Sequence, residues 1–246
     1  MAQIFHPGFN TIAKVGLALA FAAPLLIIGA ASAVSRSSYN TKVGVALDQP
    51  VPFSHEHHSN ELGINCLYCH SYVEKSAHSN LPATEVCMSC HSQIWTDSPL
   101  LEPVRESYKT NTALKWNQLN KVPEFVYFNH SIHVNRGLNC NICHGPVQQM
   151  QLAYKGKTFH MAWCLNCHRN PENYVAPRSQ VLGLYEKGQR TAASGYAGAN
   201  ISPEERALLL GQDYHRTPEE LKVGKALVKQ YGIKTKQLSD CSICHR

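Results

Sequence analysis

The residues best able to do chemistry in this sequence are cysteine and histidine groups with one fixed spacing. Cys66-Leu-Tyr-Cys69-His70 is a C-x-x-C-H motif, the pattern that attaches a c-type haem covalently. In this motif the two thiols add to the haem vinyl groups, and the adjacent histidine binds the iron from one side. The chemistry that these residues predict is electron exchange at a bound iron.

The motif occurs five times and uses all ten cysteines of the chain. The thiol pairs are Cys66/Cys69, Cys87/Cys90, Cys140/Cys143, Cys164/Cys167 and Cys241/Cys244, and the histidines that follow them are His70, His91, His144, His168 and His245. Disulfides and zinc sites also use paired cysteines, but neither explains a histidine directly after every pair. The sequence therefore predicts five covalently bound c-type haems and no free thiol nucleophile.

The formal net charge of +6 is a poor guide to partners. Five haems would add about ten propionate carboxylates and bring the net charge to about −4. The lysines and arginines are scattered rather than clustered, so no nucleic-acid partner is expected. A chain this rich in haem sites is expected to pack around porphyrins rather than around a conventional apolar core.

An uncharged run covers residues 15–35. As a helix it would be about 31 Å long, close to the thickness of a bilayer's hydrocarbon core. The A-S-A sequence at residues 31–33 suggests a cleaved signal peptide instead, but the run exceeds the roughly 7–15 apolar residues usual in a signal. We expect a retained single-span anchor within residues 1–35, with Pro24 tolerated as a kink, and a linker over residues 36–50. The haem-bearing remainder is then expected on the periplasmic, outer face of a bacterial cytoplasmic membrane.

A second pattern, F-x-H-x-x-H, precedes two of the attachment motifs. Its copies are Phe53/His55/His58 before Cys66 and Phe128/His130/His133 before Cys140. A further motif follows each copy, so we expect a two-haem module used twice, over residues 51–120 and 121–175, with the fifth haem in residues 176–246.

Each histidine pair has a polar residue before it that can begin a helix. Ser54 and Asn129 are good N-caps, which places each pair on the first turn of a short helix. Residues three apart share one face of a helix, and every iron already has a motif histidine. The two histidines of a pair are therefore expected to bind two different haems. His57 has no counterpart in the second copy and is expected at the surface.

The fold class predicted is mainly α-helix and coil with little regular secondary structure. Residues 171–200 have the composition of a linker. Two capping boxes with proline at the first helical position follow, at residues 202–205 and 217–220. The second helix is expected to end near Gly232.

F-x-H-x-x-H before C-x-x-C-H is similar to the class III multihaem cytochromes, in which the first histidine typically serves the haem of the next motif and the second a neighbouring haem. With an anchor, two such modules and a terminal motif, nearly the whole chain resembles the pentahaem subunit of bacterial alternative complex III. The resemblance includes Cys87-Met-Ser-Cys90-His91 and Met161-Ala-Trp163-Cys164.

This resemblance implies an electron-transfer subunit of a quinol-oxidising respiratory or photosynthetic complex, and not an enzyme by itself. Implied partners are an iron–sulfur protein, polytopic quinol-binding subunits and a monohaem cytochrome c. The downstream acceptor would be a cytochrome c, a copper protein or an oxidase. Alternatives are a self-sufficient, membrane-anchored quinol dehydrogenase that feeds a periplasmic reductase, and a haem enzyme with one five-coordinate iron.

The two histidine pairs supply four distal ligands, so a fifth is needed. The resemblance implies one haem with histidine and methionine ligands, which favours Met150 or Met161. His78, His160 and His215 stay open as candidates, and so does the order of the haems in space.

Overall fold

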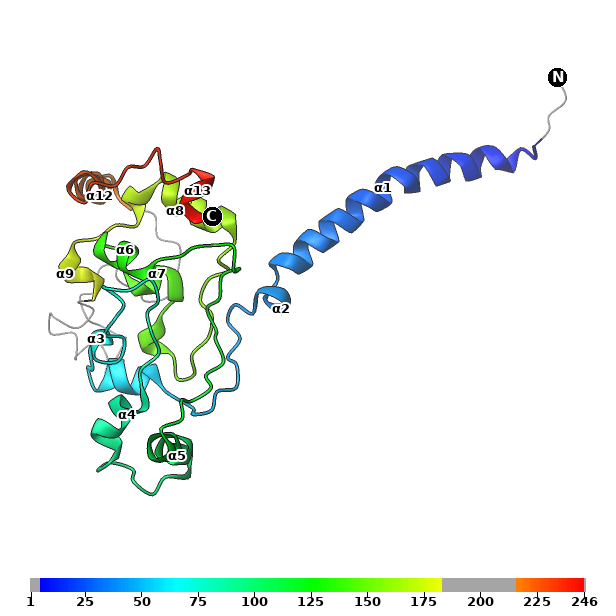
Figure 1. Ribbon diagram of the computed structural model, residues 1–246. Coiled ribbons are helices and arrows are strands. Elements are labelled where there is room, and N and C mark those ends of the chain that lie inside the picture. Colours follow the sequence, from blue (N-terminus) through cyan, green and yellow to red (C-terminus); the bar gives the residue numbers. More distant parts are fainter. Residues whose placement is uncertain (1–4, 183–215, 246) are drawn as a thin grey trace. The chain divides into compact units, whose positions relative to one another are not determined.

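The computed structural model describes residues 5–182 and 216–245, and the chain divides into two compact units (Figure 1). The first unit is Met1–Val43 and the second is Gly44–Arg246. The boundary between them falls inside the linker expected at residues 36–50.

The first unit is built on one long apolar helix, α1 (Gly8–Arg36), followed by the short α2 (Ser38–Thr41). Its 29 residues would measure about 44 Å, more than the roughly 30 Å of a hydrocarbon core. Pro24 lies inside the helix, and none of its residues is buried. By length and composition α1 is compatible with a single-pass membrane anchor.

The second unit consists of short helices joined by irregular chain. Its segments are η1 (Glu56–Glu61), α3 (Cys66–Cys69), α4 (Thr84–His91), η2 (Pro99–Leu101), α5 (Glu102–Thr110), α6 (His130–Asn135), α7 (Cys140–His144), η3 (Val147–Gln149), α8 (Met161–Arg169), η4 (Pro171–Asn173), α9 (Arg178–Val181), α12 (Pro218–Gln230) and α13 (Cys241–Cys244). Within residues 44–182 and 216–245 there is no β-strand, only an isolated antiparallel bridge between Ala46 and Tyr154. The predicted class, mainly helix and coil, is confirmed.

Every attachment motif lies in a helix, and two of these helices begin in the same way. Asn65 accepts a hydrogen bond from Leu67 N at 2.8 Å at the start of α3, and Asn139 accepts one from Asn141 N at 2.9 Å at the start of α7. Two residues before each asparagine, a glycine takes a positive φ, +68° at Gly63 and +83° at Gly137. That backbone region favours glycine. The G-x-N-C sequence therefore forms the same turn before α3 and before α7.

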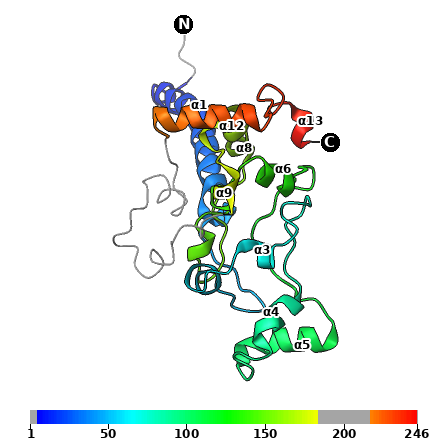
Figure 2. The same ribbon diagram turned by 90° about the vertical axis from the view of Figure 1, so that its left-hand side faces the viewer.

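The apolar core is divided into small clusters. Val51, Leu101 and Val104 form one, and Met88 packs against it. Val73, Val134 and Val181 form another. In both Figure 1 and Figure 2, α4 and α5 lie at one end of the second unit, α8, α12 and α13 lie at the other, and α3 lies between them.

The capping box before α12 is confirmed. Thr217 N donates to Glu220 Oε2 at 2.6 Å, and Glu220 N donates to Thr217 Oγ1 at 3.4 Å. The helix ends at Gln230, and Gly232 follows with φ +62°, as expected of a glycine stop. The helix expected after the box at residues 202–205 lies outside the described residues.

The prediction of a linker is wrong for residues 171–182. Val175 is fully buried and Val181 is 2% exposed. η4 packs against α12, where a Cβ at Gly224 would lie 2.1 Å from Glu172 O. Glycine at this position lets the two backbones approach, and the contact holds the segment in place.

Candidate haem sites

Three pairs of histidine rings lie at nearly the same separation. The ring centroids are 6.2 Å apart for His58 and His91, 6.2 Å for His130 and His144, and 6.1 Å for His133 and His168. Each pair joins one histidine of an F-x-H-x-x-H copy to one motif histidine. The elements brought together are η1 with α4, α6 with α7, and α6 with α8.

This separation is the one expected of two rings on opposite sides of one metal ion. An imidazole nitrogen lies about 1.1 Å from its ring centroid, and a metal–imidazole bond is about 2.0 Å long, so the two centroids lie about 6.2 Å apart. Each of the three histidine pairs would therefore suit a haem iron held between its two imidazoles.

Seven histidines have their Nδ1 atom held by a backbone carbonyl. The Nδ1–O distances are 2.8 Å for His58 to Ser54, 2.9 Å for His70 to Asn80, 3.1 Å for His91 to Ile94, 2.9 Å for His130 to Ala77, 2.7 Å for His133 to Asn129, 2.9 Å for His168 to Leu238 and 3.2 Å for His245 to Phe125. A carbonyl can only accept, so Nδ1 carries the proton and Nε2 keeps its lone pair. Metal-binding histidines are typically oriented in this way.

The remaining two histidines of these sites, His55 and His144, are held neutral by burial. Burial lowers the pKa of His55 from 6.5 to about 4, with smaller contributions from nearby His70, His58 and His144. Burial lowers the pKa of His144 to about 4 as well, with contributions from His130 and His70. A lowered pKa means that the ring is neutral at pH 7, as a metal ligand must be. The buried Nδ1 of His55 makes no hydrogen bond to the described part of the chain.

One phenylalanine orients both histidines in each F-x-H-x-x-H copy. Phe53 meets His55 edge-on, with centroids 4.9 Å apart and planes at 88°, and stacks on His58 at 4.4 Å and 27°. Phe128 meets His130 at 4.7 Å and 90° and stacks on His133 at 4.5 Å and 27°. The two copies therefore have the same geometry, although they lie far apart in the sequence.

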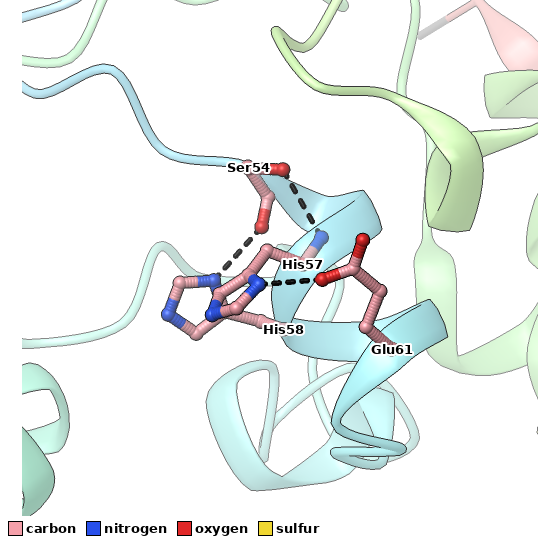
Figure 3. Close-up of polar contacts among 4 residues, drawn as sticks. All are labelled: Ser54, His57, His58 and Glu61. Carbon is pink, nitrogen blue, oxygen red and sulfur yellow. Dashed lines mark hydrogen bonds and ion pairs between the residues drawn. The ribbon is translucent and has the colours of Figure 1, made fainter. Parts of the chain in front are cut away.

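The two copies differ in the helix that follows. Asn129 caps α6 by accepting from Ile132 N, as expected. Ser54 Oγ likewise accepts from His57 N at 3.1 Å (Figure 3). Yet η1 is a π-helix, in which Leu62 N bonds to His57 O. His57 is exposed and pairs with Glu61 at 2.7 Å, so its predicted surface position is confirmed.

None of the ten cysteines forms a disulfide. Burial raises the pKa of Cys143 and of Cys167 to about 12, which keeps both thiols uncharged. A thioether is also uncharged, so these positions suit attachment through sulfur. Nowhere in residues 5–182 and 216–245 do three His, Cys, Asp or Glu side chains gather as a metal site needs.

The candidates for the fifth distal ligand lie in different places. Met150 is buried, with 2% exposure, whereas Met161 is 61% exposed at the start of α8. His78 and His160 are exposed, and His215 lies outside the described residues.

The backbone carbonyls that hold the histidine rings were missed by sequence reasoning. Ala77 and Leu238 are examples, because each supports a ring more than fifty positions away. No side-chain pattern marks such a carbonyl, so the sequence carries no signal for it.

Comparisons with known proteins agree with this chemistry. The family of cytochrome c7 and related cytochrome c matches residues 126–195, which include the second F-x-H-x-x-H copy and two attachment motifs. The multihaem cytochrome c subunit of menaquinone reductase from Nitratidesulfovibrio vulgaris is 32% identical over 149 residues, covering 52% of this chain and 70% of that protein. With its repeated C-x-x-C-H motifs, its paired histidine rings and this similarity, the chain belongs to the multihaem cytochrome c family.

Proposed function

We propose that this chain is the pentahaem electron-transfer subunit of a membrane-bound, quinol-oxidising complex of the alternative complex III type. The observation that carries the proposal is the separation of 6.1–6.2 Å in three histidine pairs. The two histidines of each pair would hold a haem iron between them and would leave it no open position for a substrate. A haem held in this way supplies electron exchange, and the protein tunes its potential through ligands and burial.

The proposed ligand pairs follow one rule in both modules. The first histidine of a copy serves the next motif and the second serves the motif after it. The pairs are His55 with His70, His58 with His91, His130 with His144, and His133 with His168. Ring separations support the last three, and the electrostatic interaction of His55 with His70 supports the first.

For the fifth site we propose Met161. It lies on α8 with Cys164, whose thiol interacts electrostatically with Cys244 of the last motif. Met150 lies elsewhere, because its carbonyl accepts from Glu56 N and its terminal methyl lies 3.5 Å from the position of a Cβ on Gly145. Thioether coordination raises a haem's potential relative to two imidazoles.

A variant pair tests the fifth ligand. Met161→Ala is expected to abolish the highest-potential transition in a redox titration, whereas His160→Ala, at the neighbouring exposed position, leaves that transition in place. The reverse result would assign the site to His160.

In the proposed setting, α1 supports attachment to a membrane, and the resemblance to alternative complex III suggests the partners. This helix would hold the haem unit at the periplasmic face of the cytoplasmic membrane, beside an iron–sulfur protein, polytopic quinol-binding subunits and a monohaem cytochrome c. Electrons would leave to a cytochrome c, a copper protein or an oxidase.

A second function has its own observation. The relative from N. vulgaris is a subunit of a menaquinone reductase, which favours electron flow in the opposite direction, toward the quinone. The haem sites would be the same in both cases.

The intact complex, purified from native membranes, tests both functions. Pyridine haemochrome and intact mass are expected to give five covalent haems per chain, and a count of four would overturn the pentahaem assignment. Under anaerobic conditions a menaquinol analogue is expected to reduce the haems. If menaquinone instead oxidises pre-reduced haems and menaquinol has no effect, the second function is correct. A high-spin iron that binds cyanide in the untreated complex would contradict both.

A further inference from the structure

The two histidine modules meet at their first attachment motifs. The side chains of Cys66 and Cys140, the leading cysteines of the first and third motifs, lie close enough to each other to interact. Histidines of both modules gather at the same place, because His144 interacts electrostatically with His70 as well as with His130. The first and third attachment sites are therefore neighbours in space.

The backbone joins the modules at the same point. The loop after the first motif accepts three hydrogen bonds from the first turn of α6: His130 N to Ala77 O at 3.0 Å, His130 Nδ1 to Ala77 O at 2.9 Å, and Ser131 N to Ser76 O at 3.2 Å. Asn135 Nδ2 donates to Glu74 O at 2.8 Å. These four hydrogen bonds between the loop and α6 fix the distance between the first and third attachment sites.

The other motifs continue outward from this junction. On one side, the Tyr68 hydroxyl of the first motif is hydrogen-bonded to the Ser89 hydroxyl of the second at 2.8 Å. On the other side, α6 joins the third and fourth motifs, because its His130 and His133 rings lie 6.2 Å and 6.1 Å from the rings of His144 and His168. His168 Nδ1 of the fourth motif donates to Leu238 O, three residues before the fifth, at 2.9 Å. Figures 1 and 2 are consistent with this order, because α4 and α13 lie at opposite ends of the unit and α3 lies between α4 and α8.

We propose that the five attachment sites form one row in the order second, first, third, fourth, fifth, so that the modules join through their first sites. The proposal rests on the proposed function, because it requires all five motifs to be loaded. It makes the second and fifth sites the terminal positions, where partner proteins would exchange electrons with the chain. The row differs from sequence order only at the first two sites, and that difference can be measured.

Removing single sites tests the order, because a charge change at one site shifts the midpoint potentials of its neighbours. The double variant Cys66→Ala/Cys69→Ala is expected to shift two of the four remaining midpoints in a potentiometric titration. Cys87→Ala/Cys90→Ala is expected to shift one. The matched control, Cys241→Ala/Cys244→Ala, removes a site that is terminal in either order and is expected to shift one.

If the first-site variant shifts one midpoint and the second-site variant shifts two, the sites follow sequence order and the proposal is wrong. A haem count of four with four low-spin signals in each variant leaves the proposed function standing in either case.

Variants that keep every haem attached give a second measurement if a double variant does not fold. His55→Met and His58→Met each raise the potential of one site. The first is expected to move two other midpoints and the second to move one, and the reverse pattern overturns the order.

Discussion

Gly137→Ala tests how closely the chain packs beside the third attachment motif. Gly137 has φ +83°, a left-handed conformation that costs an L-residue about 1–2 kcal/mol. A Cβ there would lie 2.3 Å from Ala176 O and 2.8 Å from the Tyr231 ring, so these groups must move. Ala176 N donates to Gly137 O at 2.8 Å, and Tyr231 donates to Ala176 O at 3.0 Å. Losing two bonds of about 1 kcal/mol each, in addition to the backbone strain, lowers the free energy of unfolding by about 3–4 kcal/mol.

Gly44→Ala is the matched control, because Gly44 has φ +74° and nothing lies within 4 Å of its Cβ position. Gly44→Ala is expected to lower the free energy of unfolding only by the backbone strain, about 1–2 kcal/mol. In a unit of this size each kcal/mol lowers the midpoint by about 2–4 °C, so we expect a fall of about 10 °C for Gly137→Ala and about 3–5 °C for Gly44→Ala. Circular dichroism in the Soret band of the haem-loaded protein measures the thermal midpoint of both variants. Equal falls would refute the close approach at Gly137.

Three further predictions concern the haem sites and the anchor. His58→Ala is expected to leave one high-spin haem in low-temperature EPR, whereas His57→Ala, at the exposed neighbouring position, leaves all haems low-spin; if both variants stay low-spin, His58 is not a ligand. A chain lacking residues 1–35, secreted behind a cleavable signal, is expected to be soluble and haem-loaded, and its sedimentation with membranes in the absence of partners would contradict the anchor. The ring planes cross at 63° in the pair that contains His58 and at 6° in the pair that contains His130. Crossed imidazoles bring two iron d orbitals closer in energy, so the EPR signal lost in His58→Ala is expected at a larger g value than the signal lost in His130→Ala, and the opposite order would contradict these ring angles.

Local chemistry explains which parts of the fold could be predicted. Asn129 and Thr217 begin their helices as expected because a cap depends on residues two or three positions away. The segment around Val175 was taken for a linker because glycine, proline and serine are common both in free chain and in packed irregular chain. Only its contact with α12, which lies more than forty positions later, distinguishes the two.

The residues of the candidate sites could be proposed from the sequence, whereas their arrangement in space could not. Covalent attachment requires cysteines and a histidine at one spacing, so the motifs can be read directly. Their neighbours in space depend on contacts such as the one between Cys66 and Cys140, which no periodicity records. The π-helix after Ser54 shows the same limit, because a nearly identical pattern after Asn129 forms an α-helix.

The loop at Ser76 and Ala77 suggests an order of folding for the second unit, with the first histidine module forming before the second. It orients His130, which lies 53 positions later, so the second module takes its geometry from the first. During synthesis the earlier part of a chain is free to fold before the later part exists. The loop is therefore available as a template when α6 emerges, and an error in the loop would be passed on to the later module, while an error in α6 would leave the loop itself intact.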